Sequence, residues 1–240
     1  MTRVVMLAGV GAVLVAAGCG GSPGSRTTAR SAPEPAPAPA AHRPAHRVLI
    51  GALGDSITAG SPSWDPNPDV RGRLGDRLNQ QSQYEYWARQ RLGPNAEFRN
   101  CGVFGERTDQ IAARLDDCAR GARVLIVQGG INDVAQGSSI DAAADNIRAM
   151  VRHGKQLGLT VELVDVLPWN NGYPRAAPQI ARLNTLIAGI ARSQHVRLYP
   201  FFHTLEDPSR PGRMRSDWTI DGDHPSVAGY RRLGELIQVS

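Results

Sequence analysis

Two clusters in this 240-residue sequence hold residue types that could do nucleophilic chemistry together. A Gly-Asp-Ser run ends at Ser56, and His224 follows Asp221 by three positions. A serine on a tight turn can act as a nucleophile when a histidine removes its proton and a carboxylate orients the imidazole. Asp223 is the alternative orienting acid, although adjacency to His224 usually points the two side chains apart. Taken singly, each cluster is as well explained by an ordinary turn or helix cap.

Two further clusters could stabilise negative charge. Residues 100–105 include two glycines, which allow backbone N–H groups to approach a ligand closely. Residues 129–133 include Asn132, whose side-chain N–H could point at an oxyanion. The four clusters together supply a nucleophile, a base, an orienting acid and oxyanion donors, which favours a catalytic site over four unrelated turns.

Apolar runs typical of buried parallel strands recur along the chain, and helical patterns separate them. The expected strands are residues 48–53, 96–100, 124–127, 161–166 and 196–199, and the expected helices are 84–92, 108–119, 140–157, 179–193 and 227–239. This alternation predicts a three-layer α/β/α sandwich with a mainly parallel five-stranded sheet. In such sheets the chemistry lies in loops at the carboxyl ends of strands, where three of the clusters stand; the fourth precedes the last helix.

The four clusters resemble those of the SGNH (GDSL-type) hydrolase family, and the resemblance runs from about residue 47 to residue 239. It implies a flavodoxin-like SGNH hydrolase fold, with Ser56 as nucleophile, His224 as base and Asp221 as its partner. It implies an oxyanion hole made of the backbone N–H groups of Ser56 and Gly105 and the side chain of Asn132. The expected reaction is two-step hydrolysis of an ester through an acyl-enzyme, with no cofactor and no metal.

Long loops near the expected site suggest what shapes the substrate pocket. Trp64, Trp169 and Tyr173 could form a wall for a sugar or a short acyl chain, or could simply cover the core. We expect short-chain acyl esters as substrates, including acetyl groups on carbohydrate. Lysophospholipase, thioesterase and acyltransferase activities on the same site remain alternatives, as does a cell-envelope lipoprotein that binds without catalysing.

The first 46 residues read as a targeting segment and a spacer. A basic start and an apolar run over residues 4–17 are typical of a signal peptide, predicted here as residues 1–18. Small residues before Cys19 resemble the lipobox of bacterial lipoproteins, which implies a lipidated cysteine and a membrane-anchored protein outside the cytoplasm; an ordinary secretory signal is the alternative. Residues 19–46 predict a disordered linker rich in Pro, Ala, Gly and Ser, followed by a hydrolase domain over 47–240.

The cysteine count and the charge balance bear on the compartment and on the binding partners of the protein. If Cys19 carries lipid, Cys101 and Cys118 remain as an even pair in an oxidising compartment, and they could form a disulfide or stay two buried thiols. The chain carries 27 basic and 22 acidic residues, and much of the excess lies before residue 47, so the domain is near neutral and does not favour nucleic acid. We expect a monomer whose partner is a small ester and whose membrane contact is the N-terminal lipid alone.

Overall fold

The structure is a computed structural model in which residues 47–238 are described. The predicted signal peptide (1–18) and the predicted lipidated Cys19 with its linker (19–46) lie outside the described residues. The strands are β1 (Val48–Gly54), β2 (Ala96–Gly102), β3 (Val124–Val127), β4 (Thr160–Val164) and β5 (Arg197–Tyr199). The helices are α1 (Ser56–Ala59), α2 (Pro68–Arg71), α3 (Tyr84–Leu92), α4 (Thr108–Ala112), α5 (Leu115–Ala119), α6 (Ile131–Ala135), α7 (Ile140–Gln156), α8 (Ala177–Gln194), α9 (Phe201–Leu205) and α10 (Val227–Leu236), with a 3₁₀ helix, η1, at Gly75–Arg77.

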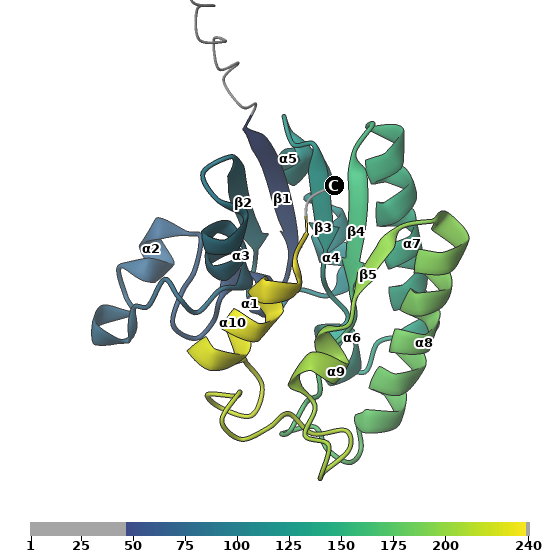
Figure 1. The fold of residues 1–240 in the computed structure, drawn as a ribbon. Helices are drawn as coiled ribbons and strands as arrows, with labels where there is room; N and C mark the ends of the chain where they lie inside the picture. Colours follow the sequence, from purple (N-terminus) through teal and green to yellow (C-terminus); the bar gives the residue numbers. More distant parts are fainter. Residues whose placement is uncertain (1–46, 239–240) are drawn as a thin grey trace, which may run out of the picture. The chain divides into compact units, whose positions relative to one another are not determined.

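The five strands form one sheet in the order β2-β1-β3-β4-β5, and every pair is parallel (Figure 1). The predicted α/β fold with a five-stranded parallel sheet is therefore confirmed. The chain leaves β1 toward β2 on one side and later returns to place β3 on the other side of β1. The loops that follow β1 and β3 consequently diverge, and the carboxyl end of the sheet opens between them.

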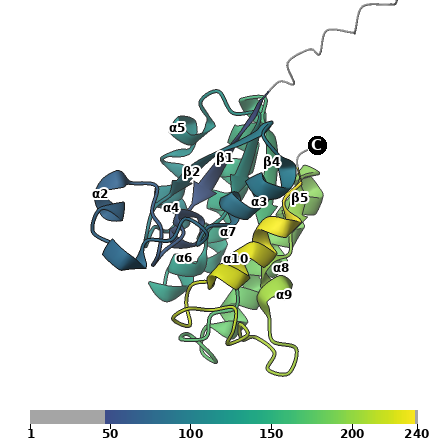
Figure 2. The same ribbon diagram turned by 60° about the vertical axis from the view of Figure 1, so that its left-hand side comes forward.

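Alternate strand residues enter two separate cores, one on each face of the sheet. Leu53, Leu125 and Val127 pack with α4, α5, α7 and α8, whereas Ile50 and Ile126 pack with α3, α9 and α10. Figure 1 shows α7 and α8 on one face of the sheet and α3 and α10 on the other. Figure 2 shows α3 beside α10, which closes the second face. Burial of both faces explains why the strands read as continuous apolar runs rather than alternating ones.

The expected single helix over residues 108–119 is wrong. The chain forms α4 and α5 with a turn between them, in which the N–H of Arg114 donates to the carbonyl of Ile111, three residues back, at 3.1 Å. The side chain of Arg114 reaches the ends of the strands instead of continuing along a helix surface. Tertiary contacts of one side chain thus divide a segment whose apolar spacing is helical throughout.

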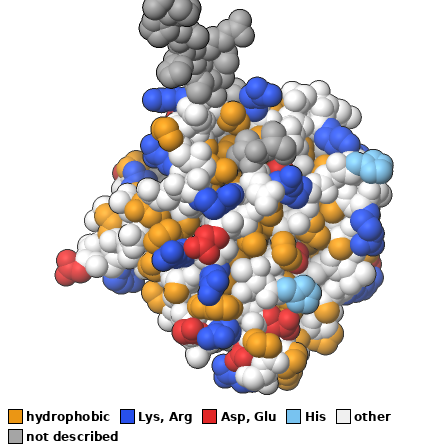
Figure 3. All heavy atoms as spheres, in the orientation of Figure 1, with side chains coloured by type: hydrophobic (Ala, Val, Ile, Leu, Met, Phe, Trp, Pro, Cys, Tyr) orange, Lys and Arg blue, Asp and Glu red, His pale blue; other side chains and the backbone are white. Residues whose placement is uncertain are grey.

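The segment between α1 and α3, which carries Trp64 and is expected to be a long loop, contains α2 and η1. No helix within residues 47–238 is long and apolar enough to cross a membrane. On the face seen in Figure 3, basic and acidic side chains are interspersed rather than gathered by sign.

Candidate active site

Ser56 is the first residue of α1 and stands two residues after the end of β1. The side chain of Asp55 caps this helix by accepting a hydrogen bond from the backbone N–H of residue 57 at 2.9 Å. A Cβ at Gly54 would overlap with Thr58 Oγ1 and Gln128 Oε1, so only glycine allows β1 to end this close to them. Gln128 Oε1 also accepts the backbone N–H of Asp55 at 3.0 Å. The turn that carries Ser56 is therefore fixed by the Asp55 cap and by Gln128, the residue directly after β3.

The structure brings together the three residues expected to form a catalytic triad. His224 Nε2 lies 3.1 Å from Ser56 Oγ, and His224 Nδ1 lies 2.8 Å from Asp221 Oδ2. Ser56 and His224 are separated by 168 residues in the chain and are 5% and 9% exposed. The hydroxyl, the imidazole and the carboxylate form one hydrogen-bonded chain, which is the arrangement that nucleophilic acyl transfer requires.

Hydrogen bonds keep the Asp221 carboxylate ionised. Partial burial raises the pKa of Asp221. The backbone and side-chain hydrogen bonds from His224 and the hydrogen bond from the N–H of Asp223 together lower the pKa by more, so it lies below its ordinary value. Asp221 Oδ1 accepts the backbone N–H groups of Asp223 and His224 at 2.9 and 2.7 Å. An ionised partner at Nδ1 favours the tautomer that carries its proton there and leaves Nε2 free to accept the serine proton.

Asp223, the alternative orienting acid, is hydrogen-bonded to Trp169, whereas the imidazole Nδ1 is bonded to Asp221. Its Oδ1 accepts the indole N–H of Trp169 at 2.5 Å. Two more hydrogen bonds continue the pairing in antiparallel order: Asn170 N donates to the carbonyl of Gly222 at 3.0 Å, and Asn171 Nδ2 donates to the carbonyl of Asp221 at 3.0 Å. The loop after β4 therefore supports each residue from 221 to 223 in turn.

Each of the three expected oxyanion donors has an N–H that donates to no acceptor within residues 47–238. Within residues 47–238, the backbone N–H groups of Ser56 and Gly105 donate to no protein acceptor. Asn132 Nδ2 donates to the carbonyl of Glu106 at 2.9 Å, which leaves the second amide hydrogen free. Asn132 and Ser56 line the same cavity. The Ser56 N–H and the Asn132 amide can therefore donate to a negative charge that develops next to Ser56. Gly105 does not line this cavity, although its neighbour Phe104 does.

The cavity beside Ser56 is small, with a volume of about 170 Å³. It is lined by Ser56, Ile57, Phe104, Ile131, Asn132, Ala135, Trp169, Asp223 and His224. Phe104 is 65% exposed, and its ring stacks against that of His224 with 6.2 Å between centroids. Sequence reasoning missed Phe104; the only available signal was an aromatic residue directly before Gly105 in a cluster otherwise interpreted as a turn.

Of the three aromatic residues expected to form a wall, only Trp169 lines this cavity. Trp64 lines a different cavity of about 410 Å³ against α3 and β2, and the Arg71 guanidinium lies 5.0 Å from its ring centroid. The ring of Tyr173 is covered by Arg213 at 4.4 Å. The predicted wall is therefore wrong for Trp64 and Tyr173, because the loops that carry them turn their rings toward arginines.

Cys101 and Cys118 form a disulfide between the end of β2 and α5. Cys101 stands one residue before Gly102 and four before Gly105, so the disulfide lies close along the chain to one of the expected oxyanion donors. Among residues 47–238 no cluster of three or more His, Cys, Asp or Glu side chains could hold a metal ion.

Residues 52–232 match the model of the GDSL-like Lipase/Acylhydrolase family. No curated protein matches the sequence. Among solved structures, the fold is similar to that of a protein of the G-D-S-L lipolytic family from Desulfitobacterium hafniense DCB-2, with 19% identity, a TM-score of 0.65, and coverage of 79% of this chain and 97% of that one.

Two other solved structures are comparably similar. A GDSL-like lipase from Bacteroides thetaiotaomicron is 20% identical with a TM-score of 0.61, covering 78% of this chain and 84% of that one. A variant of an acetyl-xylooligosaccharide esterase from Geobacillus stearmophilus is 20% identical with a TM-score of 0.62, covering 79% of this chain and 91% of that one. At these identities, the similarity establishes a shared fold.

Proposed function

Because the chain belongs to the GDSL-like lipase/acylhydrolase family, we propose that it is an exported serine esterase that hydrolyses short-chain acyl esters. Membership in the family confirms the resemblance predicted from the sequence and makes the protein a hydrolase of carboxylic esters. The observation that carries the proposal is the hydrogen-bonded chain from Ser56 through His224 to Asp221.

The first half of the reaction forms an acyl-enzyme. Ser56 Oγ attacks the carbonyl carbon of the ester while His224 Nε2 takes the hydroxyl proton. Asp221, held ionised by its hydrogen bonds, orients the imidazole and stabilises its positive charge. His224 then gives the proton to the departing alcohol oxygen, and the acyl group remains on Ser56.

The second half repeats these steps with water in place of the serine hydroxyl. His224 removes a proton from the water as it attacks the acyl carbon, and Ser56 leaves with that proton. In both halves the tetrahedral oxyanion accepts hydrogen bonds from the Ser56 and Gly105 N–H groups and the Asn132 amide. Such donors act most strongly in the transition state, where the negative charge is largest.

The size of the cavity favours a short acyl chain. A volume of about 170 Å³ lies well below the roughly 300–1,000 Å³ of pockets for drug-sized ligands. Ile57, Ile131 and Ala135 give the cavity an apolar wall that suits a methyl or propyl group. Acetyl groups on carbohydrate are the substrates we favour, since one protein of the same fold is an acetyl-xylooligosaccharide esterase.

Export is part of the same proposal. The Cys101–Cys118 disulfide supports an oxidising compartment, as do the apolar N-terminal run and the small residues before Cys19. We propose a lipid-anchored protein on the outer side of the cell membrane. Globomycin-sensitive processing and labelling with a radioactive fatty acid, both abolished in Cys19→Ala, would support the anchor; secretion of an unlabelled protein would contradict it.

Hydrolysis of p-nitrophenyl acetate, butyrate and octanoate by the purified protein tests the activity. We expect the highest kcat/KM for acetate or butyrate and a loss of activity in Ser56→Ala to the level without enzyme. Equal rates in the wild-type protein and Ser56→Ala would contradict a serine esterase and favour a binding lipoprotein. Product analysis with an added alcohol separates hydrolysis, which yields only free acid, from acyl transfer, which yields a new ester.

A further inference from the structure

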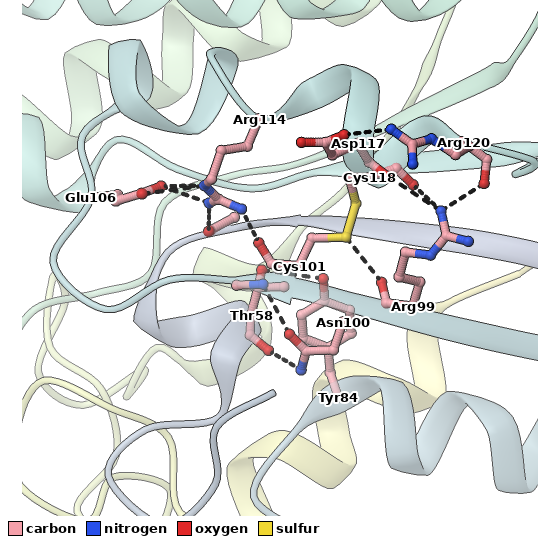
Figure 4. Close-up of a disulfide and its surroundings, with 12 residues drawn as sticks. Thr58, Tyr84, Arg99, Asn100, Cys101, Glu106, Arg114, Asp117, Cys118 and Arg120 are labelled. Carbon is pink, nitrogen blue, oxygen red and sulfur yellow. Dashed lines mark hydrogen bonds and ion pairs between the residues drawn. A yellow bond between two sulfur atoms is a disulfide. The ribbon is translucent and has the colours of Figure 1, made fainter. Parts of the chain in front are cut away.

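An ion pair joins the loop that carries Gly105 to the start of α5. Arg114, the residue before α5, donates to Glu106 Oε2 from Nε at 2.9 Å and from Nη2 at 2.6 Å (Figure 4). The two side chains are only 26% and 17% exposed. A forked contact that is largely shielded from water fixes geometry more firmly than an exposed ion pair, so Glu106 has a defined position.

The same guanidinium binds the ends of two strands. Arg114 Nη1 donates to the carbonyl of Cys101 at 2.7 Å, and Nη2 donates to the carbonyl of Gly54 at 3.2 Å. Gly54 stands two residues before Ser56, and Cys101 stands four residues before Gly105. Arg114 therefore connects the segment that presents the nucleophile with the segment that presents an oxyanion donor.

Glu106 links Arg114 to Asn132 through two hydrogen-bonded groups. Its backbone carbonyl accepts the hydrogen bond from Asn132 Nδ2 at 2.9 Å, while its carboxylate accepts from Arg114. The neighbouring carbonyl, that of Gly105, accepts from Gln136 Nε2 at 3.0 Å. Gly105 itself has a φ of +79°, a conformation that favours glycine, and nothing lies within 4 Å of where its Cβ would be.

Helix α5 is fixed to β2 by two further connections. With five residues it is too short to be stable alone, but the Cys101–Cys118 disulfide joins it to β2. Arg99 Nη1 donates to the carbonyls of Cys118 and Arg120 at 3.1 and 2.6 Å and so binds the same C-terminal end of the helix (Figure 4). The helix that begins directly after Arg114 is therefore fixed to β2 at its C-terminal end.

We propose that Arg114 is a positioning residue for the oxyanion hole: through Glu106 it holds the Gly105 N–H and the free Asn132 amide hydrogen in place for the transition state. The proposal rests on the function proposed above. It assigns to Arg114 no contact with substrate. Since the donors it positions act mainly on the developing oxyanion, loss of Arg114 should lower kcat with little change in KM.

The test compares Arg114→Gln with Arg182→Gln, measured on p-nitrophenyl acetate. Arg182 forms a forked contact with Asp141 between α7 and α8, away from the site, and serves as the matched control. We expect kcat to fall about 10- to 100-fold in Arg114→Gln and to stay unchanged in Arg182→Gln. The expected fall is no larger than that caused by the loss of one oxyanion donor. A boronic acid that adds to Ser56 as a tetrahedral anion should bind more weakly by a similar factor.

Glu106→Gln keeps the backbone carbonyl that Asn132 binds and removes only the carboxylate charge. If Arg114 acts through Glu106, the double variant should be no slower than the slower single variant. An unchanged kcat in Arg114→Gln, a rise in KM alone, or additive losses would overturn the proposal. If Arg114→Gln does not fold, the kcat, the KM and the boronic-acid affinity of Glu106→Gln test the proposal instead. Activity that persists in Ser56→Ala would instead overturn the proposed function, and this inference with it.

Discussion

The two segments that meet at Ser56 are held by different kinds of interaction. Residues 221–224, the acid–base segment, are supported by hydrogen bonds from Trp169, Asn170 and Asn171 on the loop after β4. Residues 103–106, the oxyanion segment, are attached to α5 by a shielded ion pair, and the strand before them carries a disulfide. The first support consists of single hydrogen bonds, whereas the second includes a charge pair and a covalent bond.

This difference fits the work that each segment would do. An imidazole that passes protons between a serine, a leaving group and water needs an oriented ring, which one ionised carboxylate can provide. Oxyanion donors act by being preorganised, so an error in their position reduces their effect directly. We therefore expect catalysis to be more sensitive to changes in the oxyanion segment's supports than to changes in those of the acid–base segment.

Removal of the Asn132 side chain, the proposed oxyanion donor that contacts Glu106, should have the largest effect. We expect kcat for p-nitrophenyl acetate to fall about 10²- to 10³-fold in Asn132→Ala, with KM nearly unchanged, because the amide acts mainly on the transition state. Asn132→Asp, which keeps the size and adds a negative charge, should be at least as slow. A kcat within about threefold of the wild-type value in Asn132→Ala would remove this residue from the oxyanion hole.

Loss of the disulfide should weaken the whole fold and reduce activity less. The bridged cysteines are 17 residues apart, so we expect Cys101→Ala/Cys118→Ala to lower the free energy of unfolding by about 3 kcal/mol in a urea titration. Below the unfolding transition kcat should remain within about tenfold of the wild-type value, since the Arg114 contacts persist. The same variant should be insensitive to dithiothreitol, whereas the wild-type protein should lose stability in it.

Asp55, which directly precedes Ser56, should make stability depend on pH. Complete burial raises the pKa of Asp55 to about 6, and hydrogen bonds from Ile57 and Gln128 offset only part of that increase. The folded protein then binds a proton that the unfolded chain has lost, so this contribution to stability is present below about pH 4 and disappears as pH rises toward 6. One oxygen of the carboxylate, Oδ2, has no hydrogen-bond partner within residues 47–238.

Asp55→Asn keeps the shape of the side chain and removes its titration. The variant should gain stability relative to the wild-type protein by about 3 kcal/mol between pH 4 and pH 8, measured by urea unfolding at each pH. Asp69→Asn makes the same chemical substitution on an exposed helix end and serves as the control. A constant difference between Asp55→Asn and wild type across this range would contradict the raised pKa.

A weaker support of the acid–base segment should give the smallest effect. Trp169→Phe removes the indole N–H that Asp223 accepts but keeps an aromatic ring against the cavity. We expect kcat to fall about tenfold or less, which corresponds to roughly 1.4 kcal/mol. Trp64→Phe, outside this cavity, should match the wild-type protein. If Trp169→Phe proved slower than Arg114→Gln, the contrast between the two segments would be wrong.

The order of elements and the place of the site followed from the sequence. Continuous apolar runs separated by helical spacing are what a parallel sheet buried on both faces requires, and the chemistry-bearing residues stand where those runs end. Ser56 and Asn132 follow neighbouring strands in the sheet, β1 and β3. The pairing of Asp221 with His224 could also be inferred, because three positions allow a carboxylate to turn back to an imidazole.

Only the tertiary structure decided which side chains support the site. Helical periodicity continues across residues 108–119, but the contacts of Arg114 with Gly54 and Cys101, distant in sequence, separate α4 from α5. Nothing in the sequence distinguished Trp64 from Trp169 or marked Phe104 as a site residue. In the structure, Trp169 and Phe104 line the cavity beside Ser56, and Trp64 does not. A loop has no periodicity that fixes where its side chains point, so their direction depends on contacts between segments that meet only after the sheet has formed.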